Sequence, residues 1–128
     1  MKKLITILAL AGLFQACKEA PVTINDINAA TAEQMIMDNS ELLIVDVRTP
    51  EEYAEGHLAK AQNLNFYDND FANQLEGLDK DKEYVVYCRV GGRSAKAVAK
   101  MQAAGFTNVH NLLGGINGWM EAGAAVVE

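Results

Sequence analysis

The sequence predicts an α/β fold: an open parallel sheet of five strands with helices on both faces. Short apolar segments alternate along the chain with amphipathic ones, and this alternation is typical of parallel strands joined by crossover helices. The chain has 128 residues, of which 50% are apolar and 22% are charged. That is enough for one domain with its own core. Sheets of this kind bind ligands at the carboxyl ends of their strands.

The strands are predicted by short apolar stretches. Residues 42–47 are apolar except for Asp46, as expected for a parallel strand buried on both faces. Residues 84–87 are β-branched and aromatic, a composition that favours a strand. The five predicted strands cover residues 24–27, 42–47, 61–64, 83–87 and 106–112.

The helices are predicted by residues that favour helix starts and ends. Thr31 and Gln34 have the spacing of a capping box. Thr49, followed by Pro50 and then by Glu52 at the third helical position, is a favourable start. The predicted helices cover residues 31–38, 70–75, 94–104 and 116–122, with one more that begins at Thr49 and ends at Gly56.

The first sixteen residues have the pattern of a signal peptide. Two lysines precede an apolar run over residues 4–14, which is shorter than the roughly 18 residues expected of a spanning helix. Residues 14–17, Phe-Gln-Ala-Cys, resemble a bacterial lipobox, in which the cysteine is lipidated and becomes the mature N-terminus. The alternative is an ordinary secretory signal followed by an incidental cysteine. We expect a lipoprotein signal peptide at 1–16, a lipidated N-terminus and short tether at 17–23, and one domain at 24–128.

The expected location follows from this resemblance. The residue after Cys17 is Lys18 and not aspartate. This resembles the pattern of lipoproteins that are sorted to the outer membrane, whereas aspartate is typical of retention at the inner membrane. Lys18-Glu19 also resembles a surface-export tag of some lineages. We therefore expect an exported protein whose lipid on Cys17 attaches it to the outer membrane facing the periplasm, with the cell surface as the alternative.

Charge and cysteine content exclude several function classes. The net charge is −6, with no run of basic residues, which argues against binding to nucleic acid or directly to anionic lipid. His57 and His110 are far apart in the sequence and suggest no metal site, and no cofactor is expected. If Cys17 receives the lipid, Cys88 has no disulfide partner within the chain. In an oxidising compartment, such a thiol needs either a reductant nearby or chemistry that passes through a persulfide.

The segment 88–94, Cys-Arg-Val-Gly-Gly-Arg-Ser, lies between a predicted strand and a predicted helix. A helix N-terminus and nearby cations both lower the pKa of a thiol, and free NH groups of a curled loop can point at a thiolate or an anion. The two glycines permit positive φ values, and the two arginines bind oxyanions. The predicted nucleophile is Cys88, with substrate bound by Arg89, Val90, Gly91, Gly92, Arg93 and Ser94.

Together with motifs elsewhere, this loop resembles that of single-domain rhodaneses. The motifs occur in the family's order and spacing over about residues 24–127: Asp46-Val47-Arg48, Glu52, Gly56-His57, the loop at 88–94 and Gly114-Gly115-Ile116-Asn117-Gly118-Trp119. One element departs, since the family usually has Pro-Gly-Ala after Gly56-His57-Leu58 and this chain has Ala59-Lys60-Ala61. The resemblance implies a rhodanese-like α/β domain and a sulfurtransferase of the thiosulfate:cyanide class.

The length of the loop bears on the type of reaction. Four residues separate Cys88 from Arg93, giving the six-residue loop of sulfurtransferases, whereas related phosphatases and arsenate reductases use a seven-residue loop. The expected reaction moves sulfane sulfur from thiosulfate, or from a polysulfide or persulfide, through a Cys88 persulfide to cyanide or a thiol. The alternatives are a sulfur-carrier or protein-interaction module with little turnover and, less favoured, a small phosphatase or arsenate reductase.

The remaining motif residues have competing interpretations. Asp46 and Arg48 are expected at the rim of the active site, unless Arg48 pairs with Glu52 and fixes the corner between strand and helix. His57 is expected to satisfy backbone groups at a turn, and Ser94 either donates its hydroxyl to the thiolate or caps the helix. Gly114-Gly115 and Trp119 are expected to set a turn and pack the last helix. The oligomeric state is not predicted.

Overall fold

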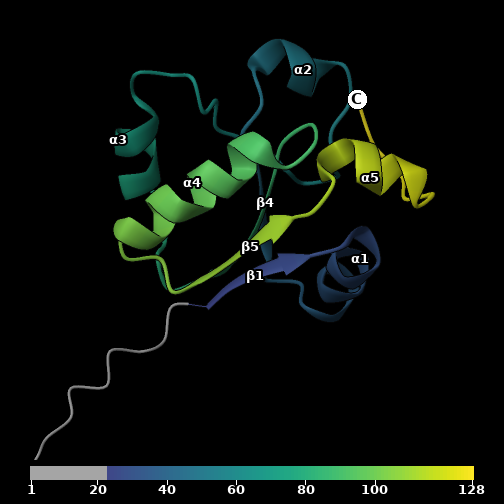
Figure 1. Ribbon diagram of the computed structural model, residues 1–128, viewed down its shortest axis with the longest axis horizontal. Helices are drawn as coiled ribbons and strands as arrows, with labels where there is room; N and C mark the ends of the chain where they lie inside the picture. The colour runs from purple at the N-terminus through teal and green to yellow at the C-terminus, as the bar shows by residue number, and fades with distance from the viewer. Residues whose placement is uncertain (1–22) are drawn as a thin grey trace, which may run out of the picture.

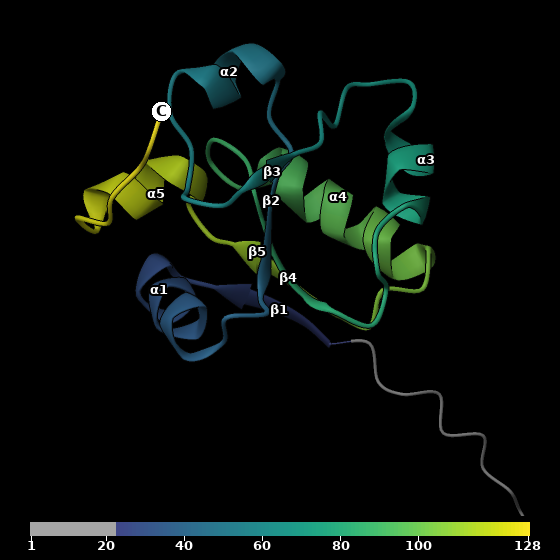
Figure 2. The same ribbon diagram turned by 180° about the vertical axis from the view of Figure 1, so that it is seen from behind.

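The computed structural model describes residues 23–128 and confirms the α/β fold. The predictions for residues 1–22, which include the signal peptide and Cys17, lie outside the described residues. All strand pairings are parallel, and the five-stranded sheet has the order β1-β5-β4-β2-β3 (Figures 1 and 2). The strands are β1 (Thr23–Ile27), β2 (Leu43–Asp46), β3 (Gln62–Asn63), β4 (Glu83–Tyr87) and β5 (Asn108–Leu112).

Helices cover both faces of the sheet, as predicted. Helices α3 and α4 pack on one face and α1 and α5 on the other, while α2 follows the carboxyl end of β2 (Figures 1 and 2). No helix within residues 23–128 has both the length and the apolar character needed to cross a membrane. The helices are α1 (Ala29–Asp38), α2 (Pro50–Ala54), α3 (Phe71–Glu76), α4 (Gly92–Ala103) and α5 (Gly115–Glu121).

Strand β4 lies in the middle of the sheet, and Cys88 follows its last residue at the carboxyl edge of the sheet. Its side chains alternate between the two halves of the core. Tyr84 and Val86 pack with α3 and α4, whereas Val85 and Tyr87 pack with α1 and α5. Because both faces are buried, the strand needs the continuous apolar sequence that predicted it.

The helix starts confirm one capping prediction and correct another. At α2, the Thr49 side chain accepts from the Glu52 NH and Glu52 reaches back to Thr49, as the capping box predicts. At α1, the cap is Asn28, whose Oδ1 accepts from the NH of Thr31 at 2.8 Å. The prediction that Thr31 begins this helix is therefore wrong: Asn28 is a strong cap and the two alanines after it favour helix, so α1 starts earlier.

Candidate active site

The loop from Cys88 to Arg93 folds back on itself at the carboxyl end of β4. Gly91 is the N-cap of α4 and has φ of +114°, a value that side-chain-bearing residues rarely adopt. Gly92 is already the first residue of α4, outside the positive-φ region. Only Gly91 therefore needs the conformational freedom that the sequence attributed to both glycines. The turn also aims the first NH groups of α4 toward the cysteine.

The Cys88 side chain is buried, with a relative exposure of 1%, and hydrogen-bond donors surround its sulfur. The NH of Gly91 donates to Sγ at 3.0 Å, and the Ser94 hydroxyl lies 3.3 Å away. Burial by itself raises the pKa of the thiol. The Ser94 side chain and the backbone NH groups of Ser94, Gly91 and Val90 outweigh burial, so the pKa of Cys88 lies below its usual value. The loop therefore favours a thiolate.

The two arginines of the loop have different surroundings. Arg93 pairs with Glu52 of α2 through two hydrogen bonds, from Nη1 to Oε1 at 2.8 Å and from Nη2 to Oε2 at 2.9 Å. This pairing holds the pKa of Glu52 at about 2. Arg89 is exposed instead and lines a pocket beside the loop. Arg93 thus ties the loop to α2, and Arg89 is the better placed of the two to meet an anion.

Asp46 and Arg48 form a buried ion pair at the end of β2. Arg48 Nη2 lies 2.6 Å from Asp46 Oδ2 and also donates to the carbonyl oxygen of Gly56 at 2.7 Å. The alternative in which Arg48 pairs with Glu52 is therefore wrong. Asp46, which is itself fully buried, neutralises the guanidinium, and the Glu52 carboxylate is already used by the α2 cap and by Arg93. Arg48 does fix the corner between β2 and α2, with a different partner.

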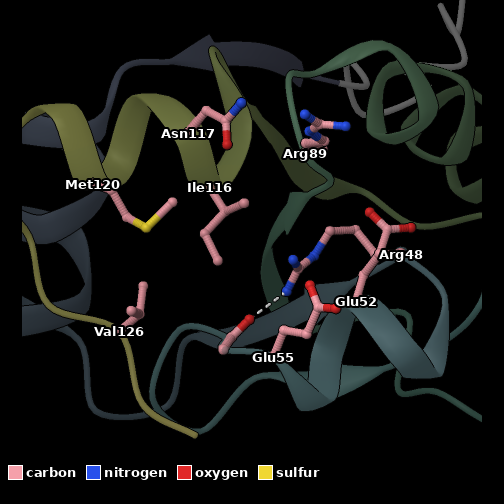
Figure 3. A pocket seen from close by; sticks show the side chains of 9 residues that line it. Arg48, Glu52, Glu55, Arg89, Ile116, Asn117, Met120 and Val126 are labelled. Atoms are coloured by element: carbon pink, nitrogen blue, oxygen red, sulfur yellow. Dashed lines mark hydrogen bonds between the residues drawn. The ribbon is translucent and has the colours of Figure 1, made fainter.

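A pocket of about 400 Å³ lies between the active-site loop, α2 and α5 (Figure 3). Charged side chains from the loop and α2 meet the apolar side of α5 there. Arg48 reaches this pocket, as expected for a residue at the rim, but Asp46 does not line it. The lining residues are Arg48, Glu52, Glu55, Gly56, Arg89, Ile116, Asn117, Met120 and Val126.

The turn between β5 and α5 is hydrogen-bonded to the backbone of the active-site loop and so holds it in place. The sequence did not reveal this role. The NH of Ile116 donates to the carbonyl oxygen of Cys88 at 2.9 Å, and that of Asn117 to Arg89 at 3.1 Å. Gly114 and Gly115 have φ of +75° and +56°, which confirms the predicted turn. A Cβ on Gly115 would collide with the carbonyl oxygen of Cys88 and with the backbone of Arg89.

His57 and Trp119 have the structural contacts that the sequence predicts. The His57 ring stacks on Tyr53 at 3.7 Å between centroids, and its Nδ1 lies 2.9 Å from the Tyr53 carbonyl oxygen. Trp119 is buried, and its Nε1 donates to the carbonyl oxygen of Ala125 at 2.9 Å.

Sequence reasoning missed one residue next to the nucleophile, Asn111. The Ser94 hydroxyl donates to Asn111 Oδ1 at 2.6 Å. Ser94 does not cap α4, whose N-cap is Gly91, so its hydroxyl is left to serve Cys88 and Asn111. The sequence does contain one signal for this role, because Asn111 is a polar residue within the predicted buried strand 106–112.

Comparison with known proteins agrees with this geometry. The rhodanese-like domain model matches residues 28–122. A sulfurtransferase from Allochromatium vinosum is 35% identical over 104 residues, covering 81% of this chain and 95% of that protein. A putative sulfurtransferase from Bacillus subtilis is 38% identical over 96 residues, covering 75% and 90%. The crystal structure of a rhodanese-related protein from Thermoplasma volcanium matches with a TM-score of 0.71 and 34% identity, covering 80% of this chain and 97% of that one. The chain belongs to the rhodanese-like domain family.

Proposed function

We propose that this protein is a sulfurtransferase that moves sulfane sulfur from an anionic donor, thiosulfate or a polysulfide, to a thiol or cyanide through a persulfide on Cys88. The observation on which the proposal rests is the state of Cys88: a buried thiol whose pKa is nevertheless lowered by NH groups and a hydroxyl. The resemblance to proteins named sulfurtransferases supports the same chemistry.

The reaction has two displacement steps. The Cys88 thiolate attacks the outer sulfur of thiosulfate, forming a new S–S bond, while the bond between the two sulfurs of thiosulfate breaks and sulfite leaves with its electron pair. An acceptor thiolate or cyanide then attacks the terminal sulfur of the persulfide, and the Cys88 thiolate is restored. The NH groups around the sulfur stabilise the anionic persulfide as an oxyanion hole stabilises an oxyanion.

The charges of the site support a small anionic donor. Glu52 neutralises Arg93 and Asp46 neutralises Arg48, so Arg89 is the loop arginine left to hold the sulfonate group at the pocket. The six-residue loop, with four residues between Cys88 and Arg93, favours sulfur over a tetrahedral phosphate. A sulfur-carrier module uses the same Cys88 persulfide with slow release, and turnover distinguishes the two.

The persulfide itself provides the test. The full chain bearing Cys17→Ser, so that Cys88 is the single thiol, is incubated with thiosulfate and separately with polysulfide, and its intact mass is measured. We expect one added sulfur atom that cyanide removes, and no addition when Cys88→Ser is also present. The absence of the adduct with both donors, or a high phosphatase rate without it, would overturn the proposal.

We also propose that the protein is exported and held at the outer membrane by a lipid on Cys17. The support is the pattern of residues 1–18: two lysines, an apolar run, the lipobox-like segment 14–17 and Lys18.

A further inference from the structure

A row of polar side chains leads from the edge of the sheet to the nucleophile. Asn111 and Asp26 are register partners on β5 and β1, and Asn111 Nδ2 donates to Asp26 Oδ1 at 3.3 Å. On its other side, Asn111 Oδ1 accepts from the Ser94 hydroxyl at 2.6 Å, and Ser94 Oγ lies 3.3 Å from Cys88 Sγ. Asn111 and Ser94 are both buried. The row connects the exposed Asp26 to the buried sulfur.

The chemistry of Asp26 sets the orientation of the Asn111 amide. An ionised carboxylate only accepts hydrogen bonds, so the NH₂ group of Asn111 faces Asp26 and its oxygen faces Ser94. That oxygen also only accepts. The hydroxyl of Ser94 has one proton, and the short distance to Asn111 shows where it points. The carbonyl oxygen of Gly91 is a second, more distant acceptor for the Ser94 hydroxyl at 3.2 Å, and it keeps the NH of Ala95 as a donor when that hydroxyl points elsewhere.

This arrangement makes Asn111 and Cys88 competitors for one proton. In the thiol form, the S–H of Cys88 donates to Ser94 and Ser94 donates to Asn111, so every group is satisfied. In the thiolate form, the hydroxyl can donate to the sulfur only by turning away from Asn111, whose buried oxygen then loses its donor at a cost in free energy. When Sγ bonds to the transferred sulfur, the negative charge moves to that outer atom and the hydroxyl returns to Asn111.

We propose that Asn111 is a positioning residue that competes with the Cys88 sulfur for the hydroxyl proton of Ser94 and so keeps the thiolate incompletely hydrogen-bonded and reactive. The role rests on the proposed function, in which Cys88 is the nucleophile. Asn111 acts through Ser94 and does not contact the substrate.

The test titrates Cys88 in the full chain with Cys17→Ser, by the ultraviolet absorbance of the thiolate and by its rate of alkylation with iodoacetamide. With Asn111→Leu, the hydroxyl is free to serve the sulfur, so we expect the thiol pKa to fall and the thiolate fraction at a pH below the midpoint to rise about fivefold. The plateau alkylation rate falls about twofold, because a less basic thiolate is a weaker nucleophile. Arg93, whose charge also reaches Cys88, is unchanged in every variant.

Two controls separate this role from a structural one. In a Ser94→Ala background, Asn111→Leu should no longer move the titration, since the shared proton is gone. Asn108→Leu makes the same change on the same strand at a residue that bonds Glu83 instead, and should leave the midpoint in place. An unmoved midpoint in folded Asn111→Leu, or an equal shift with Ser94→Ala, would overturn the proposal.

A second variant keeps the test decisive if Asn111→Leu does not fold. Asp26→Asn changes an exposed side chain and lets the Asn111 amide turn its NH₂ group toward Ser94. Loss of the Asp26 charge lowers the thiol pKa in both backgrounds, so the expected result is a larger decrease with Ser94 present than with Ser94→Ala, and equal decreases refute the proposal. These titrations use no sulfur donor, so a failure of the persulfide assay leaves their outcome distinct.

Discussion

At the scale of single residues, the thiol of Cys88 is governed by opposing effects on its pKa. Burial disfavours the thiolate, and the Ser94 hydroxyl and the NH groups around the sulfur favour it and prevail. The backbone NH groups are fixed parts of the loop. They stay within hydrogen-bond distance of the sulfur only while the loop keeps this conformation. The residues that hold the loop from below therefore matter as much as those in it.

Gly115 is the residue at which a substitution would most directly disturb the conformation of the loop. Gly115→Ala places a Cβ against the carbonyl oxygen of Cys88 at a φ of +56°, so we expect a loss of about 3 kcal/mol in the free energy of unfolding, with reduced persulfide formation in the protein that remains folded. Urea unfolding and intact mass measure the two effects. Gly118→Ala, in the same helix but with ordinary contacts, should change stability by less than about 1 kcal/mol. Equal stabilities for the two variants would contradict this account of the loop.

At the scale of elements, the sequence predicted what depends on neighbouring residues and missed what depends on distant ones. Strand β4 has the predicted bounds, because a continuous apolar run defines it. Strand β3 spans two residues instead of the predicted four, since only Gln62 and Asn63 pair with β2. The Arg93–Glu52 and Ser94–Asn111 contacts join residues 41 and 17 positions apart. No local pattern contains such pairs, so the loop was predictable but its supports were not.

The Arg93–Glu52 pair joins α2 to α4, and its effect on stability depends on pH. The pKa of Glu52 is lowered from 4.5 to about 2, so the folded state favours the carboxylate. The resulting stabilisation is complete above pH 4.5 and is lost as the pH falls toward 2. Glu52→Gln should therefore reduce the free energy of unfolding by about 1 kcal/mol at pH 7, with a smaller difference at each step below pH 4.5.

Urea unfolding at a series of pH values measures this difference. Glu55→Gln is the matched control, because Glu55 is the exposed C-cap of the same helix, and it should change stability by less than about 0.5 kcal/mol throughout. A Glu52→Gln difference that stays constant from pH 7 to pH 3 would show that the pair does not stabilise the fold through its charge.

At the scale of the whole molecule, the parallel sheet separates the start of the domain from the active site. All five strands run in the same direction (Figure 1). Strand β1 therefore begins at the amino edge of the sheet, and Cys88, which follows the last residue of β4, lies at the carboxyl edge. Residues 17–22 span at most about 20 Å when extended. A lipid on Cys17 would thus hold the domain close to the membrane, attached at the edge of the sheet opposite the active site.

The lipid on Cys17 is testable in a bacterial host that processes lipoproteins. The full chain is expressed with labelled palmitate, and membrane and soluble fractions are compared for label and protein. We expect the label in the chain and the chain in the membrane fraction, whereas Cys17→Ser removes the label, because it removes the thiol that would carry the lipid. Cys88→Ser, which changes the other cysteine, should remain labelled. Label that persists in Cys17→Ser, or an unlabelled parent chain in the soluble fraction, would show that residues 1–17 are not a lipoprotein signal.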